Sequence, residues 1–116
     1  MSINVETRDF DVVVVGGGLS GMCAAIAAAR HGAETAIVQN RSVFGGNASS
    51  EIRMHIVGAS SHGAKPDLAE TGILLELLLE NKRRNPYASF PVFDAILWEA
   101  VHQQKGLTAY LNTNMD

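Results

Sequence analysis

The stretch Asp-Val-Val-Val-Val-Gly-Gly-Gly-Leu-Ser-Gly at Asp11–Gly21 decides the fold. Its first part, Asp11–Val15, contains the β-branched block Val12–Val15 and is bounded by glycine, which is typical of a strand buried on both faces of a parallel sheet. After the glycines, apolar residues recur at helical spacing and predict a helix over about Leu19–His31. A second β-branched run, Thr35–Gln39, follows it. The order strand, helix, strand predicts a βαβ unit.

The glycines between the first strand and the helix match the pattern G-x-G-x-x-G. Gly16 permits a tight turn, Gly18 lets backbone N–H groups approach a pyrophosphate, and Gly21 lets the helix pack closely on the strand. The N-terminus of the helix adds unpaired N–H donors and a partial positive charge. A glycine-rich turn without a ligand is the alternative. The predicted dinucleotide site comprises Gly16, Gly17, Gly18, Leu19, Ser20 and Gly21.

The end of the second strand bears on which dinucleotide binds. An acidic residue about twenty positions beyond the glycines normally holds the ribose hydroxyls, but this chain has Gln39-Asn40-Arg41 there. Gln39 or Asn40 could hydrogen-bond a ribose as a neutral amide, and Arg41 could face a phosphate. From the residues alone, this favours NADP or an unusual FAD site over NAD.

Further along the chain, two helices and a third strand are expected. Asp67 can cap a helix whose apolar face includes Leu74–Leu79, and Asn85 precedes a proline that ends it. The next helix starts near Pro91, and Leu107–Asn112 is the third strand. The fold class is therefore α/β: a Rossmann-like, three-layer βαβ unit that is incomplete.

Composition excludes several other classes of function. The 116 residues carry a formal net charge of −3, so there is no basic surface for nucleic acid. The single cysteine, Cys23, excludes a disulfide framework and is expected to be an inert core thiol; no residue spacing indicates a metal site. Val12–Ala29 carries no charge but divides into strand, turn and helix, which argues against a membrane span. The N-terminus lacks a secretory signal, so a cytoplasmic protein is expected.

Several segments together resemble the FAD-dependent oxidoreductase family. They are Asp11–Gly21, Val38–Arg41 and Phe44–Arg53, with the similarity continuing through Glu70–Ile73, Arg83–Pro86 and Leu111–Thr113. The resemblance covers nearly the whole chain and implies FAD as the cofactor, with its pyrophosphate on Gly16, Gly18 and Gly21. Gln39 would stand where many flavoproteins have the ribose-binding Glu.

The resemblance also implies that the loop after the second strand runs along the cofactor toward the flavin. Gly45 and Gly46 allow close backbone approach, and Asn47 could cap a short helix that forms a second anion site. A plain Gly-Gly turn is the alternative. Main-chain contacts to the adenine are expected from about Met115.

Candidates for catalysis are few. His55 and His62 have pKa values suited to proton transfer, and Arg53 could steady an anionic flavin or substrate. A structural or solvent-exposed role explains each histidine as well, and a surface ion pair explains the arginine. The catalytic residues and the small-molecule substrate therefore stay unassigned.

These features predict that residues 1–116 are the N-terminal part of the FAD-binding domain of an oxidoreductase, with the substrate domain absent from this chain. Alone, the chain is expected to be inactive and to self-associate through apolar helix faces such as Leu74–Leu79. Two alternatives are an NADP-linked dehydrogenase domain and a non-catalytic nucleotide-binding fragment.

Overall fold

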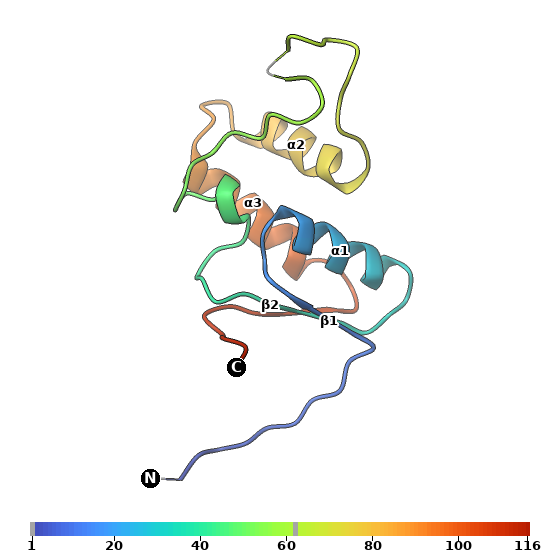
Figure 1. The fold of residues 1–116 in the computed structure, drawn as a ribbon, viewed down its shortest axis with the longest axis vertical. Coiled ribbons are helices and arrows are strands. Elements are labelled where there is room, and N and C mark those ends of the chain that lie inside the picture. Colours follow the sequence, from blue (N-terminus) through green and yellow to red (C-terminus); the bar gives the residue numbers. More distant parts are fainter. Residues whose placement is uncertain (1, 62) are drawn as a thin grey trace.

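The structure, a computed structural model, describes residues 2–61 and 63–116. Its three strands form one parallel sheet in the order β1-β2-β3, and the helices lie between them in the sequence (Figure 1). The three predicted strands and the three predicted helices are confirmed to within a few residues at most ends. The elements are β1 (Val12–Val15), α1 (Leu19–Arg30), β2 (Thr35–Val38), the 3-10 turn η1 (Gly46–Ala48), α2 (Gly72–Arg84), α3 (Phe90–His102) and β3 (Leu107–Tyr110).

The register of the sheet brings the carboxyl ends of all three strands to one edge. Val15 pairs with Val38, and Val38 pairs with Tyr110. Two backbone hydrogen bonds extend this edge beyond the strands: Gly16 N–H donates to Val38 O at 2.8 Å, and Gln39 N–H donates to Tyr110 O at 2.8 Å. The glycine loop and the end of β2 are thereby held next to one another.

The hydrophobic core lies between the sheet and the helices. Ile37 of β2, Met22 of α1 and Leu97 of α3 have no exposed surface, and neither does Phe44 in the loop after β2. Their burial fastens that loop to the helical layer. Because the hydrophobic effect scales with the apolar area that is buried, these large side chains contribute much of the free energy that favours folding.

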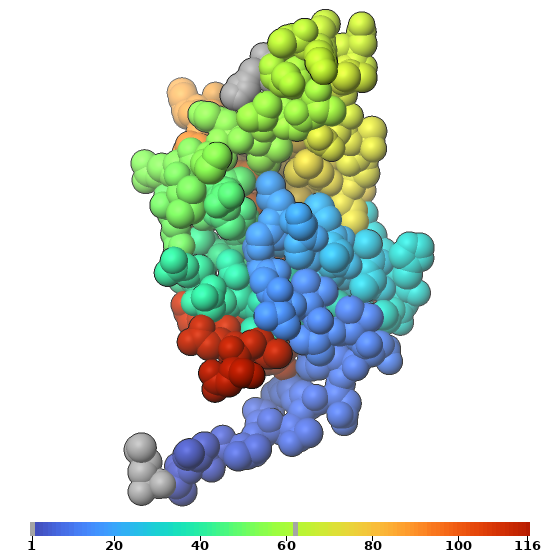
Figure 2. Space-filling view, viewed as in Figure 1, coloured from blue at the N-terminus to red at the C-terminus, as the bar shows by residue number. Residues whose placement is uncertain are grey.

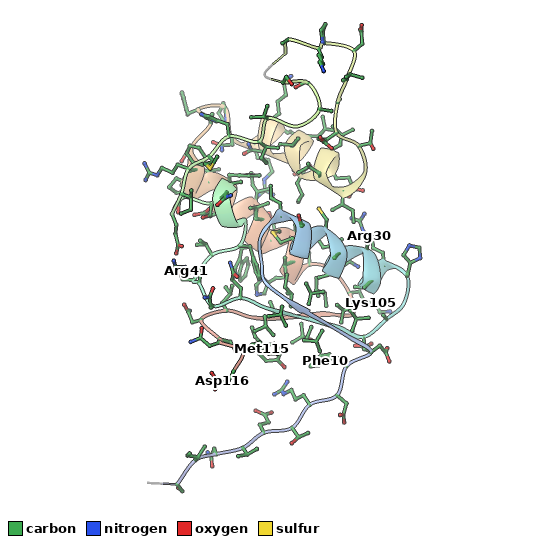
Figure 3. The ribbon with its side chains drawn as sticks, in the orientation of Figure 1. Phe10, Arg30, Arg41, Lys105, Met115 and Asp116 are labelled. Carbon is green, nitrogen blue, oxygen red and sulfur yellow. The ribbon has the colours of Figure 1, made fainter. Side chains whose placement is uncertain are left out.

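Helices α1 and α3 cover one face of the sheet, and α2 packs on these two helices on the side away from the strands (Figure 1). Val14 packs on the core, whereas Val13 and Val15, which alternate with it on the other face, are 50% and 57% exposed. Phe10 lies on this uncovered side (Figure 3), its ring edge-on to Tyr110 at 6.3 Å. The prediction that β1 is buried on both faces is therefore wrong. Among the described residues no helix covers that other face, so the predicted helical layer there is absent from them.

The start of α2 also differs from the prediction. Thr71 is its N-cap residue, and Asp67 caps nothing because the chain is still a loop there. The carboxylate of Glu70 accepts a hydrogen bond from Ala59 N–H at 2.8 Å, which holds the segment before α2 against the preceding loop. Within the apolar face of α2, Leu77 is buried and Leu79 is 56% exposed.

Candidate nucleotide-binding site

Three glycines of the loop have distinct structural roles. Gly16 has φ +110°, a left-handed conformation that the tight turn requires. A Cβ on Gly21 would lie 1.9 Å from Gly16 O, so only glycine lets α1 approach the end of β1 this closely. A Cβ on Gly18 would meet no atom within 4 Å. Gly18 therefore faces open space, as a position beside a ligand would.

Gly17 is joined to the loops on both sides of it. Its N–H donates to Oε1 of Gln39 at 3.0 Å, and its carbonyl accepts from Gly45 N–H at 2.8 Å. A Cβ there would lie 2.7 Å from a ring carbon of Phe44. Both main-chain polar groups of Gly17 are thus engaged within the protein, and its backbone is fixed against the core.

The side chain of Gln39 turns inward beneath the glycine loop. It is 7% exposed, and besides accepting from Gly17 its Nε2 donates to Val43 O at 3.2 Å. A single amide therefore supplies an acceptor to one loop and a donor to the other. Asn40, the next residue, is exposed.

The N-terminus of α1 is open toward solvent on the side of Gly18. Gly18 is the N-cap residue, and among the described residues no side chain caps this end and no acid lies in the first turn. The first N–H groups of a helix have no partner within the helix, and the dipole places a partial positive charge there. This end of α1 can accordingly hold an anion such as a pyrophosphate.

Two cavities flank the glycine loop. The first, of about 270 Å³, lies at the carboxyl ends of the strands. It is lined by Val15, Gly16, Val38, Gln39, Asn40, Thr113, Asn114 and Met115. The second, of about 540 Å³, lies at the start of α1 and is lined by Gly18, Leu19, Ser20, Gly45, Gly46, Asn47, Ala48, Met54, His55 and Ile56. The structure thus gathers most of the sequence-predicted site residues around one loop.

Arg41 lies outside both of these cavities. Its side chain is 64% exposed, at the outer edge of the molecule in Figure 3, and its Nε lies 3.5 Å from a carboxylate oxygen of Glu51. Asn47 lines the larger cavity, but it is the middle residue of η1, whose N-cap is Gly45. The expectation that Asn47 caps a short helix is therefore wrong. A cap residue directly precedes the first residue of the turn, and Asn47 lies inside the turn.

The three catalytic candidates fall in different places. His55 lines the larger cavity, with its ring centre 5.6 Å from that of Phe90. Arg53 donates through Nε to Ser50 O at 3.0 Å, which keeps its side chain on its own loop. His62 lies outside the described residues. Within residues 2–61 and 63–116 no group of His, Cys, Asp and Glu side chains could hold a metal ion.

Two residues that hold the loop after β2 in place could not be identified as such from the sequence. Phe44 is fully buried beneath Gly17, and the carboxylate of Asp94, on the buried side of α3, accepts from Ser50 N–H at 2.9 Å. Both fix the loop after β2. For Asp94 the only signal was a charge among the apolar positions of a helix. Cys23 is half-buried and lies outside the hydrophobic core, so the expectation of a core thiol is wrong, although burial raises the pKa of the thiol.

The three parallel strands and the helices between them form a Rossmann-like unit. The chain belongs to the FAD dependent oxidoreductase family, which matches residues 11–115. None of the described helices is long and apolar enough to cross a membrane.

Two similar proteins are much longer than this chain. The soluble pyridine nucleotide transhydrogenase of Chromohalobacter salexigens is 51% identical over 43 residues, which are 37% of this chain and 9% of that protein. The structure of histamine dehydrogenase from Rhizobium sp. 4-9 is also similar, with 14% sequence identity and a TM-score of 0.47. The aligned residues make up 98% of this chain and 13% of the histamine dehydrogenase chain.

Proposed function

We propose that this chain binds FAD and forms the N-terminal part of the FAD-binding domain of an oxidoreductase. The observation that carries the proposal is Gly18, which faces open space beside the uncapped end of α1 between two cavities. Membership of the FAD dependent oxidoreductase family supports FAD as the ligand. The bound isoalloxazine would supply the electron transfer, and the protein would supply its position and surroundings.

The two cavities suit the two halves of the cofactor. Main-chain N–H groups at Gly18 and the first turn of α1 would hold the pyrophosphate. The cavity at the strand ends, with Asn40 and Met115 in its lining, would take the adenosine. The larger cavity, where Gly45 and Gly46 leave room for close approach, would take the other half. Gly17 and Gln39 would keep the loop in place rather than contact the phosphate.

The residues around β2 give NADP less support than FAD. Arg41 lines neither cavity, and its Nε lies 3.5 Å from a carboxylate oxygen of Glu51, so it is not placed to meet a 2′-phosphate in the cavity at the strand ends. The amide of Gln39 is engaged by Gly17 and Val43, which leaves Asn40 as the side chain free to hydrogen-bond a ribose from this strand end.

Competition binding tests the identity of the cofactor. The purified protein is titrated with FAD by flavin fluorescence, and ADP, FMN and NADPH are added as competitors. Because the βαβ unit recognises the ADP moiety, ADP should displace FAD whereas FMN should not. Displacement by FMN but not by ADP, or tight binding of NADPH without FAD binding, would contradict the proposal.

A further inference from the structure

A third cavity adjoins the larger cavity of the glycine loop. It measures about 200 Å³ and lies where the end of α2, the start of α3 and residues 54–56 meet. Its lining comprises Ala48, Met54, His55, Ile56, Leu78, Asn81, Asn85, Ala88, Ser89, Phe90 and Phe93. The two cavities share four lining residues: Ala48, Met54, His55 and Ile56. A ligand in the third cavity would therefore lie next to the glycine-loop cavity.

The lining is mostly apolar and aromatic. Phe93 is 4% exposed and belongs to the core, while Phe90 contacts the ring of His55. Among the described residues that line it, His55 is the single titratable side chain and none carries a fixed charge. The cavity is partly open to solvent, with Met54 and His55 exposed, and its described lining residues offer an ion no charged partner. Its volume is sufficient for a benzene ring, which fits an enclosed apolar cavity of about 150 Å³.

The rim of the cavity contains a hydrogen-bonded turn, and two residues at or next to the rim have a left-handed backbone conformation. The amide of Asn85 is 7% exposed, donates to Ser89 O at 2.7 Å and accepts from Ser89 N–H at 2.9 Å. This clasp encloses Ala88, which has φ +51°. Arg53, immediately before the shared wall, has φ +62°. Such conformations cost on the order of 1 kcal/mol or more each for residues other than glycine and gather at functional sites.

From these observations we infer that this cavity binds an uncharged single-ring group of the substrate, beside the proposed cofactor site. The size and the aromatic walls select a ring, and the lack of fixed charge selects a neutral one. His55 and Asn81 line the cavity, and the ring nitrogens of His55 and the amide N–H groups of Asn81 are hydrogen-bonding groups for one polar substituent; Asn81 Oδ1 accepts from Asn85 Nδ2 at 2.9 Å. The link to a substrate rests on the proposed function, whereas the binding of a ring does not.

Binding of 4-fluorophenol, followed by fluorine NMR without FAD, tests the inference. We expect saturable binding with a Kd of about 1 mM, typical of a ligand of this size. Leu78→Trp fills the cavity and should weaken binding at least about tenfold, because an indole would occupy the volume of the ring. Leu79→Trp is the matched control: Leu79 is the next residue of α2, is 56% exposed and does not line the cavity.

Folding of each variant is checked by circular dichroism, and FAD affinity is measured in parallel. If Leu78→Trp does not fold, Phe90→Ala replaces it and should also weaken fluorophenol binding, because it removes an aromatic wall. Equal binding by Leu78→Trp and the wild type, or no saturation by the wild type, would overturn the inference. Fluorophenol binding in a protein that does not bind FAD would instead overturn the proposed function and leave the ring site standing.

Discussion

Gln39 shows how one side chain can replace an expected ligand contact with a structural one. The sequence placed it where an acidic residue would hold a ribose, yet its amide bridges Gly17 N–H and Val43 O. A carboxylate can accept a hydrogen bond from Gly17 N–H but cannot donate one to Val43 O. An amide can make both hydrogen bonds. Nothing in the linear pattern reveals the direction of that side chain, because Val43 and Phe44 come to lie there only through the loop after β2.

The first prediction is that Gln39→Glu destabilises the protein rather than tightening FAD binding. At pH 7 the buried carboxylate faces Val43 O without a proton to donate, which should cost about 1–3 kcal/mol of unfolding free energy, measured with urea. Burial raises the folded pKa of such an acid, so the loss should appear as the pH rises above about 4.3 and shrink below it. Unchanged stability with tighter FAD binding would contradict this account.

The second prediction contrasts two glycines of the loop. Gly21→Ala places a Cβ 1.9 Å from Gly16 O and should cost more than about 3 kcal/mol or prevent folding. Gly18→Ala meets no atom within 4 Å at an ordinary φ of −68°, so its stability should stay within about 1 kcal/mol of the wild type. Thermal unfolding of the two variants measures the difference, and equal losses would refute these roles.

At the scale of elements, hydrophobic periodicity predicted where the strands and helices lie. Thr35–Val38 and Leu19–Arg30 were readable because their patterns match the strand and helix repeats. The start of α2 could not be predicted in this way. Asp67 is a residue type that often caps helices, but Glu70 accepts a hydrogen bond from Ala59 N–H and keeps the segment before Thr71 in the loop. That contact joins two parts of a loop and leaves no trace in local pattern.

The third prediction concerns the contact between α1 and α2. Arg30 makes two hydrogen bonds to Glu76, at 2.9 and 2.7 Å, and this lowers the pKa of the Glu76 carboxyl. Both side chains are about half exposed, so Glu76→Gln should cost less than about 1 kcal/mol at pH 7. A lowered folded pKa means that the contribution exists above about pH 4.3 and vanishes as the pH falls further. Urea unfolding at pH 7 and pH 3 checks this; a loss of the same size at both values would contradict it.

At the scale of the whole molecule, the site depends on contacts that no local pattern contains. The glycine loop was predicted because its parts are adjacent in sequence. The cavity at the strand ends joins Gly16 to Met115, and resemblance rather than periodicity indicated the latter. His55 and Phe90 come together only through the packing of the 54–56 segment on α3, so the third cavity had no sequence signal.

The fourth prediction concerns self-association. The predicted apolar face on α2 is partly buried at Leu77, whereas the uncovered face of the sheet, on the side from which the N-terminal segment extends in Figure 2, exposes Val13 and Val15. Exposed apolar patches and unpaired strand edges promote association. The 116-residue chain should therefore associate in sedimentation velocity, and Val15→Lys should reduce this more than Leu79→Lys. A greater effect of Leu79→Lys would place the contact on α2 instead.

FAD titration of the wild type and Gly18→Val tests the central claim most directly. A valine at position 18 would project into the open space beside the end of α1 without meeting other atoms of the protein at its Cβ. The account predicts a folded variant whose FAD affinity falls at least about a hundredfold, because the side chain excludes the pyrophosphate. Undiminished FAD binding by a correctly folded Gly18→Val protein would show that this loop is not the phosphate site.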